Sequence, residues 1–188
     1  MDTVQNYLRK AGKKDAHTVL SNQITDENCS IGKLLKKSQI SQLAQRVNLE
    51  LGGLTMVLTA KDVAVEGFRW SNCGLHGVNP AGKSVFIWVG SSETQRPDQC
   101  AWPFHQPIYG PQSPPNVDVG MDGMVVNIAS LLARTVTNPY GDGYFIGSDG
   151  PGVEVASACI GVANGINGRK YLLRALFDPS TSRCSTLV

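Results

Sequence analysis

The chain has 188 residues, of which 41% are apolar and 17% charged, and its formal net charge is +2 at pH 7. This length favours one domain with its own core, and the small net charge argues against a nucleic-acid partner. Residues 1–15 contain no apolar signal-peptide core. No run of about 18 apolar residues occurs, so the sequence predicts no membrane span.

Residues 1–22 are predicted to form a weakly ordered, basic and partly helical lead-in, and residues 23–188 a single domain. We interpret the early lysines and arginines as a solvated face rather than a nucleic-acid or membrane site. Apolar residues at three- and four-residue spacing then predict a helix over about 36–47, with Ser38 as its candidate N-cap. Gly52-Gly53 ends this pattern.

Two short apolar runs follow, and both are rich in residues that favour strands. Residues 54–59 predict a strand, and residues 84–89 predict a buried central strand. The glycines of residues 70–77 predict a loop between them. Residues 91–120 hold most of the prolines and show no periodicity, which favours a functional loop or one held by a cross-link.

Residues 121–137 carry apolar side chains at helical spacing and predict the core helix of the domain. Asp122 and Arg134 suit the two ends of the helix dipole, and Asn138-Pro139 is expected to stop the helix. Further on, residues 171–173 predict a short strand or helix. Interleaved strands and helices predict a mixed α/β or α+β fold, with a short central sheet, a long core helix and Pro/Gly-rich loops.

The stretch from Cys100 to Pro111 contains three prolines and three aromatic residues, together with a histidine. Prolines stiffen the backbone, so we expect a rigid loop that displays side chains for recognition. The candidate binding residues are Trp102, Phe104, His105 and Tyr109, whose aromatic faces suit stacking on sugar rings. The alternative is that these rings pack the loop onto the sheet.

Catalytic and metal motifs are incomplete, so the sequence predicts no catalytic residue, no metal site and no cofactor. The histidines are His17, His76 and His105, and no HExxH motif is present. A metal site built from His76, His105, Cys73 and Cys100 is the weaker alternative to disulfide formation. The Gly-rich segments 141–143 and 147–150 are interpreted as tight turns rather than a calcium loop.

Nucleophilic and hydrolytic arrangements are equally sparse. No G-x-S-x-G motif occurs, although Ser91, Ser92 and Glu93 follow the predicted central strand, where α/β sheets often place ligand groups. Glu93 with Asp118 or Asp122 is the carboxylate pair to consider for a glycosidase, and Asp98 is a further acidic residue expected near His105. A hydrolase or metalloprotease-like enzyme is the alternative function.

Five cysteines are present: Cys29, Cys73, Cys100, Cys159 and Cys184. In a secreted protein this number predicts two disulfides and one spare thiol, whereas in a cytosolic one all would stay reduced. Asn28-Cys29-Ser30 is a candidate N-glycosylation site if the chain enters the secretory route.

Several blocks of this sequence together resemble the plant EXORDIUM-like, or phosphate-induced, protein family. The similarity runs from about Val19 to Val188, and its strongest blocks are SSETQ at 91–95, CAWPFHQPIYGP at 100–111, VGMDGMVVNIASLLARTVTNPYGDGYF at 119–145, NGRKYLL at 167–173 and FDPSTSRCSTLV at 177–188. The resemblance implies an N-terminally shortened member. Arg69 and Arg96 stand where relatives usually have cysteines, so the implied pairs are Cys73–Cys100 and Cys159–Cys184, with Cys29 spare.

The resemblance also implies a function. It predicts a non-enzymatic extracellular plant protein of the apoplast, linked to growth and cell expansion and to brassinosteroid or carbon responses, whose partner is a wall polysaccharide or an extracellular protein. Because the chain shows no signal peptide, intracellular retention is the alternative. The helix at 121–137 further resembles the metal helix of distantly similar bacterial proteins, with Ser130, Leu131 and Arg134 at the ligand and base positions, which implies a degenerate metalloprotease-like scaffold.

Overall fold

The computed structural model describes residues 2–14, 19–47, 53–68, 73–79, 84–105, 113–147, 152–159, 163–164, 170–171 and 176–185. The chain divides into two compact units. One unit is Ser21–Leu131, and the other joins Met1–Leu20 to Leu132–Val188. That residues 23–188 form a single domain stays a prediction.

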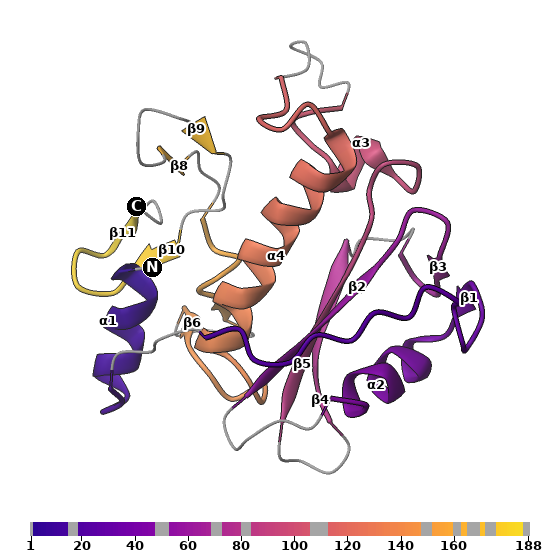
Figure 1. The fold of residues 1–188 in the computed structure, drawn as a ribbon. Helices are drawn as coiled ribbons and strands as arrows, with labels where there is room; N and C mark the ends of the chain where they lie inside the picture. Colours follow the sequence, from indigo (N-terminus) through magenta and orange to yellow (C-terminus); the bar gives the residue numbers. More distant parts are fainter. Residues whose placement is uncertain are drawn as a thin grey trace. The chain divides into compact units, whose positions relative to one another are not determined.

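The fold is mixed α/β, with small sheets and one long helix, and this confirms the predicted class (Figure 1). The elements of the Ser21–Leu131 unit are β1 (Leu34–Leu35), α2 (Lys37–Gln45), β2 (Leu54–Thr59), β3 (Ala64–Val65), β4 (Gly74–Val78), β5 (Val85–Gly90), α3 (Pro97–Cys100) and the greater part of α4 (Val119–Thr137). The remaining elements are α1 (Asp2–Lys10), β6 (Phe145–Ile146), β7 (Val153–Glu154), β8 (Ala163–Asn164), β9 (Lys170–Tyr171), β10 (Leu176–Asp178) and β11 (Arg183–Ser185).

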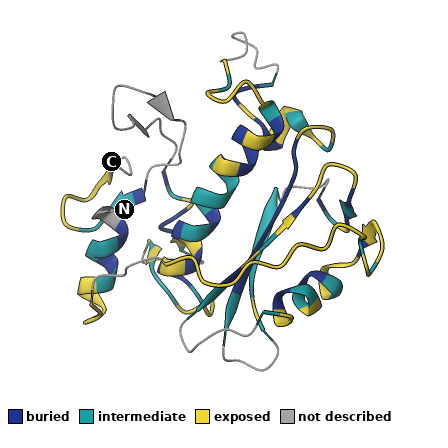
Figure 2. Ribbon diagram, in the orientation of Figure 1, coloured by how far each residue is buried: buried dark blue, intermediate teal, exposed yellow. Residues whose placement is uncertain are grey.

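The main sheet has the strand order β2-β5-β4, with β5 in the centre. β2 runs parallel to β5, from Leu54 opposite Val85 to Thr59 opposite Gly90, and β4 runs antiparallel to it. The continuous apolar run predicted this central strand, and Ile87 and Val89 are fully buried (Figure 2). The predicted strands at 54–59 and 84–89 are thus confirmed.

The expected loop at 70–77 is wrong over its second half, because β4 begins at Gly74. Its two glycines misled the prediction, since glycine ordinarily weakens a strand. Here both permit close approach of the neighbouring strand. A Cβ atom on Gly74 would lie 2.2 Å from the carbonyl oxygen of Trp88, and one on Gly77 would lie 2.8 Å from the ring of Phe86.

α2 confirms the helix predicted near 36–47, but its N-cap is Lys36 and not Ser38. The Gln39 side chain accepts the backbone N–H of Lys36 at 2.8 Å, so the helix is capped two residues earlier than expected. The buried face of α2 presents Ile40 and Ala44 to the core.

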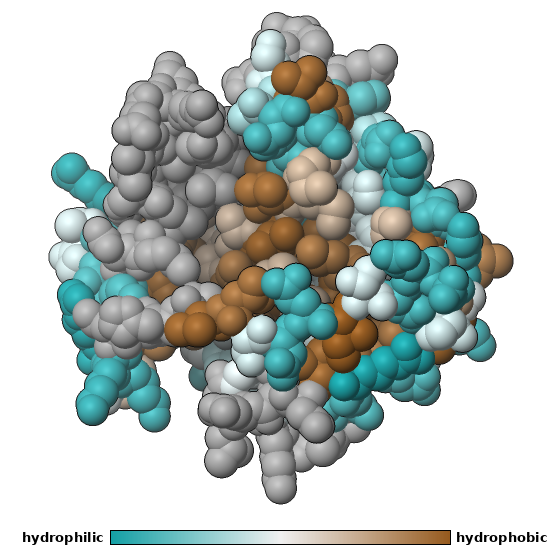
Figure 3. All heavy atoms as spheres, in the orientation of Figure 1, coloured by the Kyte–Doolittle hydropathy of each residue, from teal (hydrophilic) through white to brown (hydrophobic). Residues whose placement is uncertain are grey.

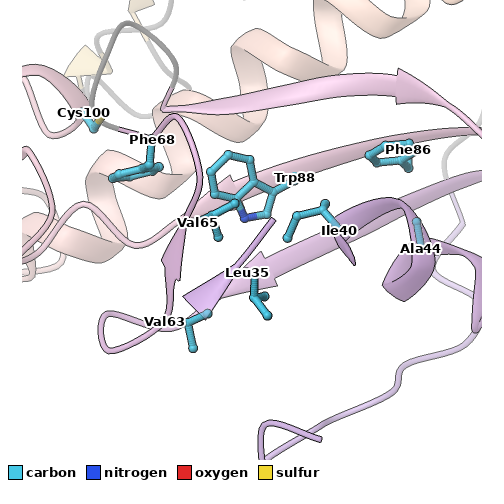
Figure 4. Close-up of a cluster of buried hydrophobic side chains, with 9 residues drawn as sticks. All are labelled: Leu35, Ile40, Ala44, Val63, Val65, Phe68, Phe86, Trp88 and Cys100. Atoms are coloured by element: carbon cyan, nitrogen blue, oxygen red, sulfur yellow. The ribbon is translucent and has the colours of Figure 1, made fainter. Parts of the chain in front are cut away.

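One apolar cluster fills the space between α2 and the main sheet (Figure 4). Its centre is Trp88, which is 1% exposed and meets the ring of Phe68 edge-on at 5.6 Å. The indole N–H of Trp88 donates to Thr59 Oγ1 at 3.0 Å, so the buried ring leaves no unsatisfied donor. Loss of such a ring typically costs about 3–5 kcal/mol.

α4 confirms the long helix, which begins at Val119 and ends at Thr137, just before Asn138-Pro139. Its first turn is capped by Asp118, whose Oδ1 accepts the backbone N–H of Met121 at 2.9 Å. The helix is only partly a core helix, because Met121 and Val125 are 53% and 46% exposed. Apolar surface is visible along α4 in Figure 3.

Among the described helices, only α4 has the length and mean hydropathy, 1.2, of a membrane-crossing helix. The core helix of a soluble protein passes the same test, and 39% of its apolar window is buried. The absence of a membrane span therefore stays a prediction.

The unit containing both termini is built around α1, which shows that the lead-in is helical over Asp2–Lys10. Its side chains Val4 and Tyr7 are buried, and Val4 packs with Ala133, Ala156 and Leu176. Tyr7 donates its hydroxyl to the carbonyl of Phe177, and its ring lies 4.8 Å from that of Tyr144. Of the predicted element at 171–173, β9 includes Tyr171, and the following residues lie outside the described ranges.

Candidate functional site

The loop that follows α3 is attached to the main sheet by a covalent bond. Cys100, the last residue of α3, forms a disulfide with Cys73, which immediately precedes β4. Cys100 is 4% exposed and belongs to the apolar cluster around Trp88. The pair is the one that the resemblance implied, and it places the start of the aromatic loop on the buried sheet.

α4 holds the same loop from its other side by an unusually close approach. Asn127 Nδ2 donates to the carbonyl of Cys100 at 2.9 Å. One turn earlier, a Cβ atom on Gly123 would lie 2.4 Å from Ser92 Oγ, 2.8 Å from the Cys100 carbonyl oxygen and 2.9 Å from Ala101 Cα. Only glycine leaves room for this contact, which places residues 100 and 101 directly against the helix.

The four predicted binding residues differ in their exposure. Trp102 is 44% exposed, whereas Phe104 is 8% exposed and contributes to packing. His105 is half-buried, and its Nδ1 atom is buried without a hydrogen-bond partner among the described residues. Tyr109 lies outside the described residues. The loop therefore combines the two alternatives of packing and display, since Phe104 packs inward and Trp102 faces solvent.

The polar residues after β5 lie at the carboxyl edge of the parallel pair β2 and β5, as predicted. Ser92 is fully buried and donates to the Gly120 carbonyl at 3.4 Å. Glu93 forms an ion pair with Lys61 at 3.0 Å, and the formation of this pair raises the pKa of Lys61. Gln95 donates to the carbonyl oxygens of Lys61 and Val63. These contacts fasten the segment to the loop after β2.

The carboxylates considered for a glycosidase have structural partners in the described part of the chain. Asp122 is 4% exposed and accepts the backbone N–H of Asn116 at 2.9 Å, instead of simply facing the helix dipole. Asp118 caps α4, and Glu93 pairs with Lys61. Asp98 forms a surface ion pair with Arg96 at 3.4 Å. Within the described ranges these carboxylates are held by separate structural partners, and a hydrolase gains no support from them.

Within the described ranges, no group of three or more His, Cys, Asp or Glu side chains is placed to hold a metal ion. The alternative site with Cys73 and Cys100 is wrong, because the disulfide consumes both thiolates. At the positions compared with a metal helix, Ser130 bonds to its own helix, Leu131 is buried and Arg134 is ion-paired with Glu154. His17 lies outside the described residues.

The second predicted disulfide, Cys159–Cys184, is also present, and Cys29 is the free thiol among the described cysteines. Asn28 is exposed beside it, as a glycosylation acceptor requires. Near the segment 141–143, the backbone N–H of Gly143 donates to Asn138 Oδ1 at 2.7 Å, and the assignment of this segment to a tight turn stays a prediction. Residues 148–150 of the second Gly-rich segment lie outside the described ranges.

Sequence reasoning missed Gly123 and Asn127, which hold the loop, and Gly120, on which a Cβ atom would lie 2.6 Å from Glu93 Cβ. A signal for them exists in the spacing, because two glycines three residues apart lie on one face of a predicted helix. Glycine inside a helix costs about 1 kcal/mol relative to alanine, so its presence indicates a packing requirement.

Comparison with known proteins identifies the family of this chain. The phosphate-induced protein 1 conserved region matches residues 1–163. The chain is 48% identical to Protein PHOSPHATE-INDUCED 1 of Nicotiana tabacum and 48% identical to Protein EXORDIUM of Arabidopsis thaliana, with 99% of this chain and 71% of each relative covered. It is 46% identical to Protein EXORDIUM-like 2 of Arabidopsis thaliana, over 90% of this chain and 67% of the relative. No solved structure matches it. The chain therefore belongs to the phosphate-induced protein 1 family of plants, which includes EXORDIUM and the EXORDIUM-like proteins.

Proposed function

We propose that this chain is a non-enzymatic extracellular protein that acts in plant growth and cell expansion by binding a cell-wall polysaccharide through Trp102. The observation that carries the proposal is the combination of an exposed indole with a fixed backbone. Trp102 is 44% exposed, while the neighbouring Ala101 is fully buried. An indole face stacks on the C–H face of a sugar ring and covers a large apolar area.

The anchoring of the loop favours binding. The disulfide at Cys100 and the hydrogen bond from Asn127 fix the residue two positions before Trp102. A side chain on a fixed backbone loses less conformational entropy when a ligand binds, so more of the contact energy appears as affinity. Exposed tryptophans are also among the residues that most often dominate binding energy.

The proposed location is supported by the cysteines. Two disulfides are formed, and such bonds persist in oxidising compartments such as the extracellular space. The exposed Asn28 of the sequon is compatible with passage through the secretory route. Secreted protein recovered from apoplastic fluid, with a mass that shows both disulfides, is the expected result. A protein retained in the cell with all its cysteines reduced would contradict the extracellular assignment.

Binding is tested with purified protein and soluble wall polysaccharides, including xyloglucan, pectin and arabinogalactan, by isothermal titration calorimetry. Trp102→Ala is expected to weaken binding at least about tenfold, because a buried aromatic anchor is worth about 2 kcal/mol or more. Tyr140→Ala is the matched control, since Tyr140 is an exposed aromatic residue at 59% that lies outside the loop. Equal binding by Trp102→Ala and the wild type would overturn the proposal.

The absence of catalysis is tested on the same polysaccharides. The protein is incubated with each one, and new reducing ends and changes in polymer length are measured. No turnover is expected, even at stoichiometric protein concentrations. Turnover that disappears in Glu93→Gln, a residue held by Lys61 in this structure, would identify an enzyme and contradict the assignment.

A further inference from the structure

The stretch of sequence that carries Trp102 has no permanent charge. From Gln99 to Val117 the chain contains no Asp, Glu, Lys or Arg, although such residues make up 17% of the whole chain. His105 is the one side chain of this stretch that ordinarily titrates near neutral pH. A carboxylate on a ligand is bound most strongly by arginine or lysine, and this stretch offers neither.

The two cations described beside this stretch are already paired with carboxylates. Arg96 Nη2 lies 3.4 Å from Asp98 Oδ2. Lys61 Nζ lies 3.0 Å from Glu93 Oε1. The hydrogen bond with Glu93, and more weakly the charge of Asp118, raise the pKa of Lys61. A carboxylate on a ligand would have to compete with these side chains for either cation.

The amino end of α4 offers no free positive pole to an anion. Asp118 Oδ1 accepts the backbone N–H of Met121 at 2.9 Å, and Asp122 Oδ2 accepts that of Asn116 at 2.9 Å. Both carboxylates lie at the start of the helix, where they neutralise the positive end of its dipole. An anion that approaches this end therefore meets like charge.

Carboxylates also outnumber cations around the anchored start of the loop. The close approach at Gly123 places Ala101 against the first turns of α4. Glu93 packs against the same end of the helix, because a Cβ atom on Gly120 would lie 2.6 Å from Glu93 Cβ. The surrounding group has two cations against four carboxylates, a net charge of −2, and its members are Lys61, Arg96, Glu93, Asp98, Asp118 and Asp122.

We propose that the Trp102 loop binds uncharged wall glycans and rejects polyuronates. The inference rests on the proposed function and names the class of polysaccharide that the loop takes. A neutral sugar ring stacks its C–H face on the exposed indole and meets no like charge. Every ring of a polyuronate carries a carboxylate into a region of net negative charge, and such like-charge contacts suppress wrong partners. Pectin is a polyuronate whose methyl esters are neutral, so the loop distinguishes its two forms.

Oligogalacturonides of equal length, in the methyl-esterified and the free-acid form, isolate the charge because their sugar rings are the same. Calorimetric titration at low salt and about pH 7.5, where histidine is ordinarily mostly neutral, measures both. The ester is expected to bind at least about tenfold more tightly than the free acid. Added salt should narrow this difference, since it screens exposed charges. Trp102→Ala should abolish binding of the ester.

Gln99→Lys tests the charge argument by a gain of binding. Gln99 is exposed in α3, three residues before Trp102. The new cation is expected to strengthen binding of the free acid by about twofold to fivefold, the range of one exposed ion pair, and to leave binding of the ester unchanged. Gln42→Lys is the matched control, because Gln42 is an exposed glutamine on α2, outside the loop. Far-UV circular dichroism verifies that both variants are folded.

Two results would overturn the inference, and they bear differently on the proposed function. Binding of the free acid that equals or exceeds binding of the ester, and that is lost in Trp102→Ala, would overturn the charge selectivity and leave recognition by Trp102 standing. Failure of both forms to bind would overturn the inference as well. Titration with xyloglucan and arabinogalactan then decides separately whether the loop binds any wall polysaccharide.

Discussion

Gly123→Ala tests whether α4 holds the aromatic loop in place. The added methyl group would lie 2.4 Å from Ser92 Oγ, 2.8 Å from the Cys100 carbonyl oxygen and 2.9 Å from Ala101 Cα. The Ser92 side chain can rotate, but the other two atoms belong to the backbone of the loop. The helix and the loop must therefore separate, or the loop must shift.

Two opposing effects decide how much Gly123→Ala changes the free energy of unfolding. Alanine is favoured over glycine inside a helix by about 1 kcal/mol, and overpacking of a close contact typically costs about 1–3 kcal/mol. Because two of the three contacts are with backbone atoms, we expect a cost in the upper half of that range. The net loss in the free energy of unfolding is then roughly 1–2 kcal/mol.

Urea unfolding followed by circular dichroism measures this loss, and limited proteolysis reports whether residues 101–105 become accessible. Ser130→Ala on the same helix is the control, because the Ser130 hydroxyl donates to the Val126 carbonyl of its own helix. This control should be close to neutral. If Gly123→Ala is instead as stable as the wild type, or gains the full helix-propensity benefit, then the loop is not held against α4 as described.

Three further predictions concern the disulfide, a buried tyrosine and an ion pair. Replacing both Cys73 and Cys100 by alanine removes a cross-link that spans 27 residues. The double variant should lose about 3–4 kcal/mol in the free energy of unfolding, measured in urea. An unchanged urea midpoint would contradict this prediction. Burial raises the pKa of Tyr7 from 10.0 to about 12. The stabilising contribution of its neutral hydroxyl is therefore complete below pH 10 and is lost as the pH rises toward 12. Between pH 10 and pH 12, the free energy of unfolding of Tyr7→Phe should depend less on pH than that of the wild type. Arg134→Ala leaves the carboxylate of Glu154, which is 7% exposed, without its cation. This variant should lower the free energy of unfolding by about 1–3 kcal/mol, measured by thermal unfolding. Glu154→Gln should cost less, because the amide still accepts a hydrogen bond.

The sequence predicted the elements whose side chains carry a strong pattern. The continuous apolar run of β5 and the three- and four-residue spacing of apolar residues in α4 reflect which side chains are buried. Both patterns can be read from the sequence alone. β4 was missed because its glycines are needed for close approach to β5, and this need depends on the neighbouring strand. The N-cap was missed because the Gln39 side chain satisfies the Lys36 amide, and a serine two residues later gave the stronger local signal.

The candidate site was predicted only in outline. The prolines and aromatic residues marked the loop, but composition does not tell which rings face solvent. Trp102 and Phe104 are two residues apart and have the same apolar character, and the structure exposes one and buries the other. Their different exposure depends on how the loop packs, and the contacts that hold its start, from Cys100 to Cys73 and to Asn127, are distant in sequence.

Trp102 recognition is tested most directly by NMR of the tryptophan indole N–H groups during titration with wall oligosaccharides. The chain has three tryptophans, and Trp88 is an internal reference because it is 1% exposed. We predict that the Trp102 resonance shifts with ligand concentration, that the Trp88 resonance stays in place, and that Trp102→Ala abolishes saturable binding. A ligand that binds without shifting the Trp102 resonance, or that binds the Trp102→Ala variant equally well, would contradict the role proposed for this loop.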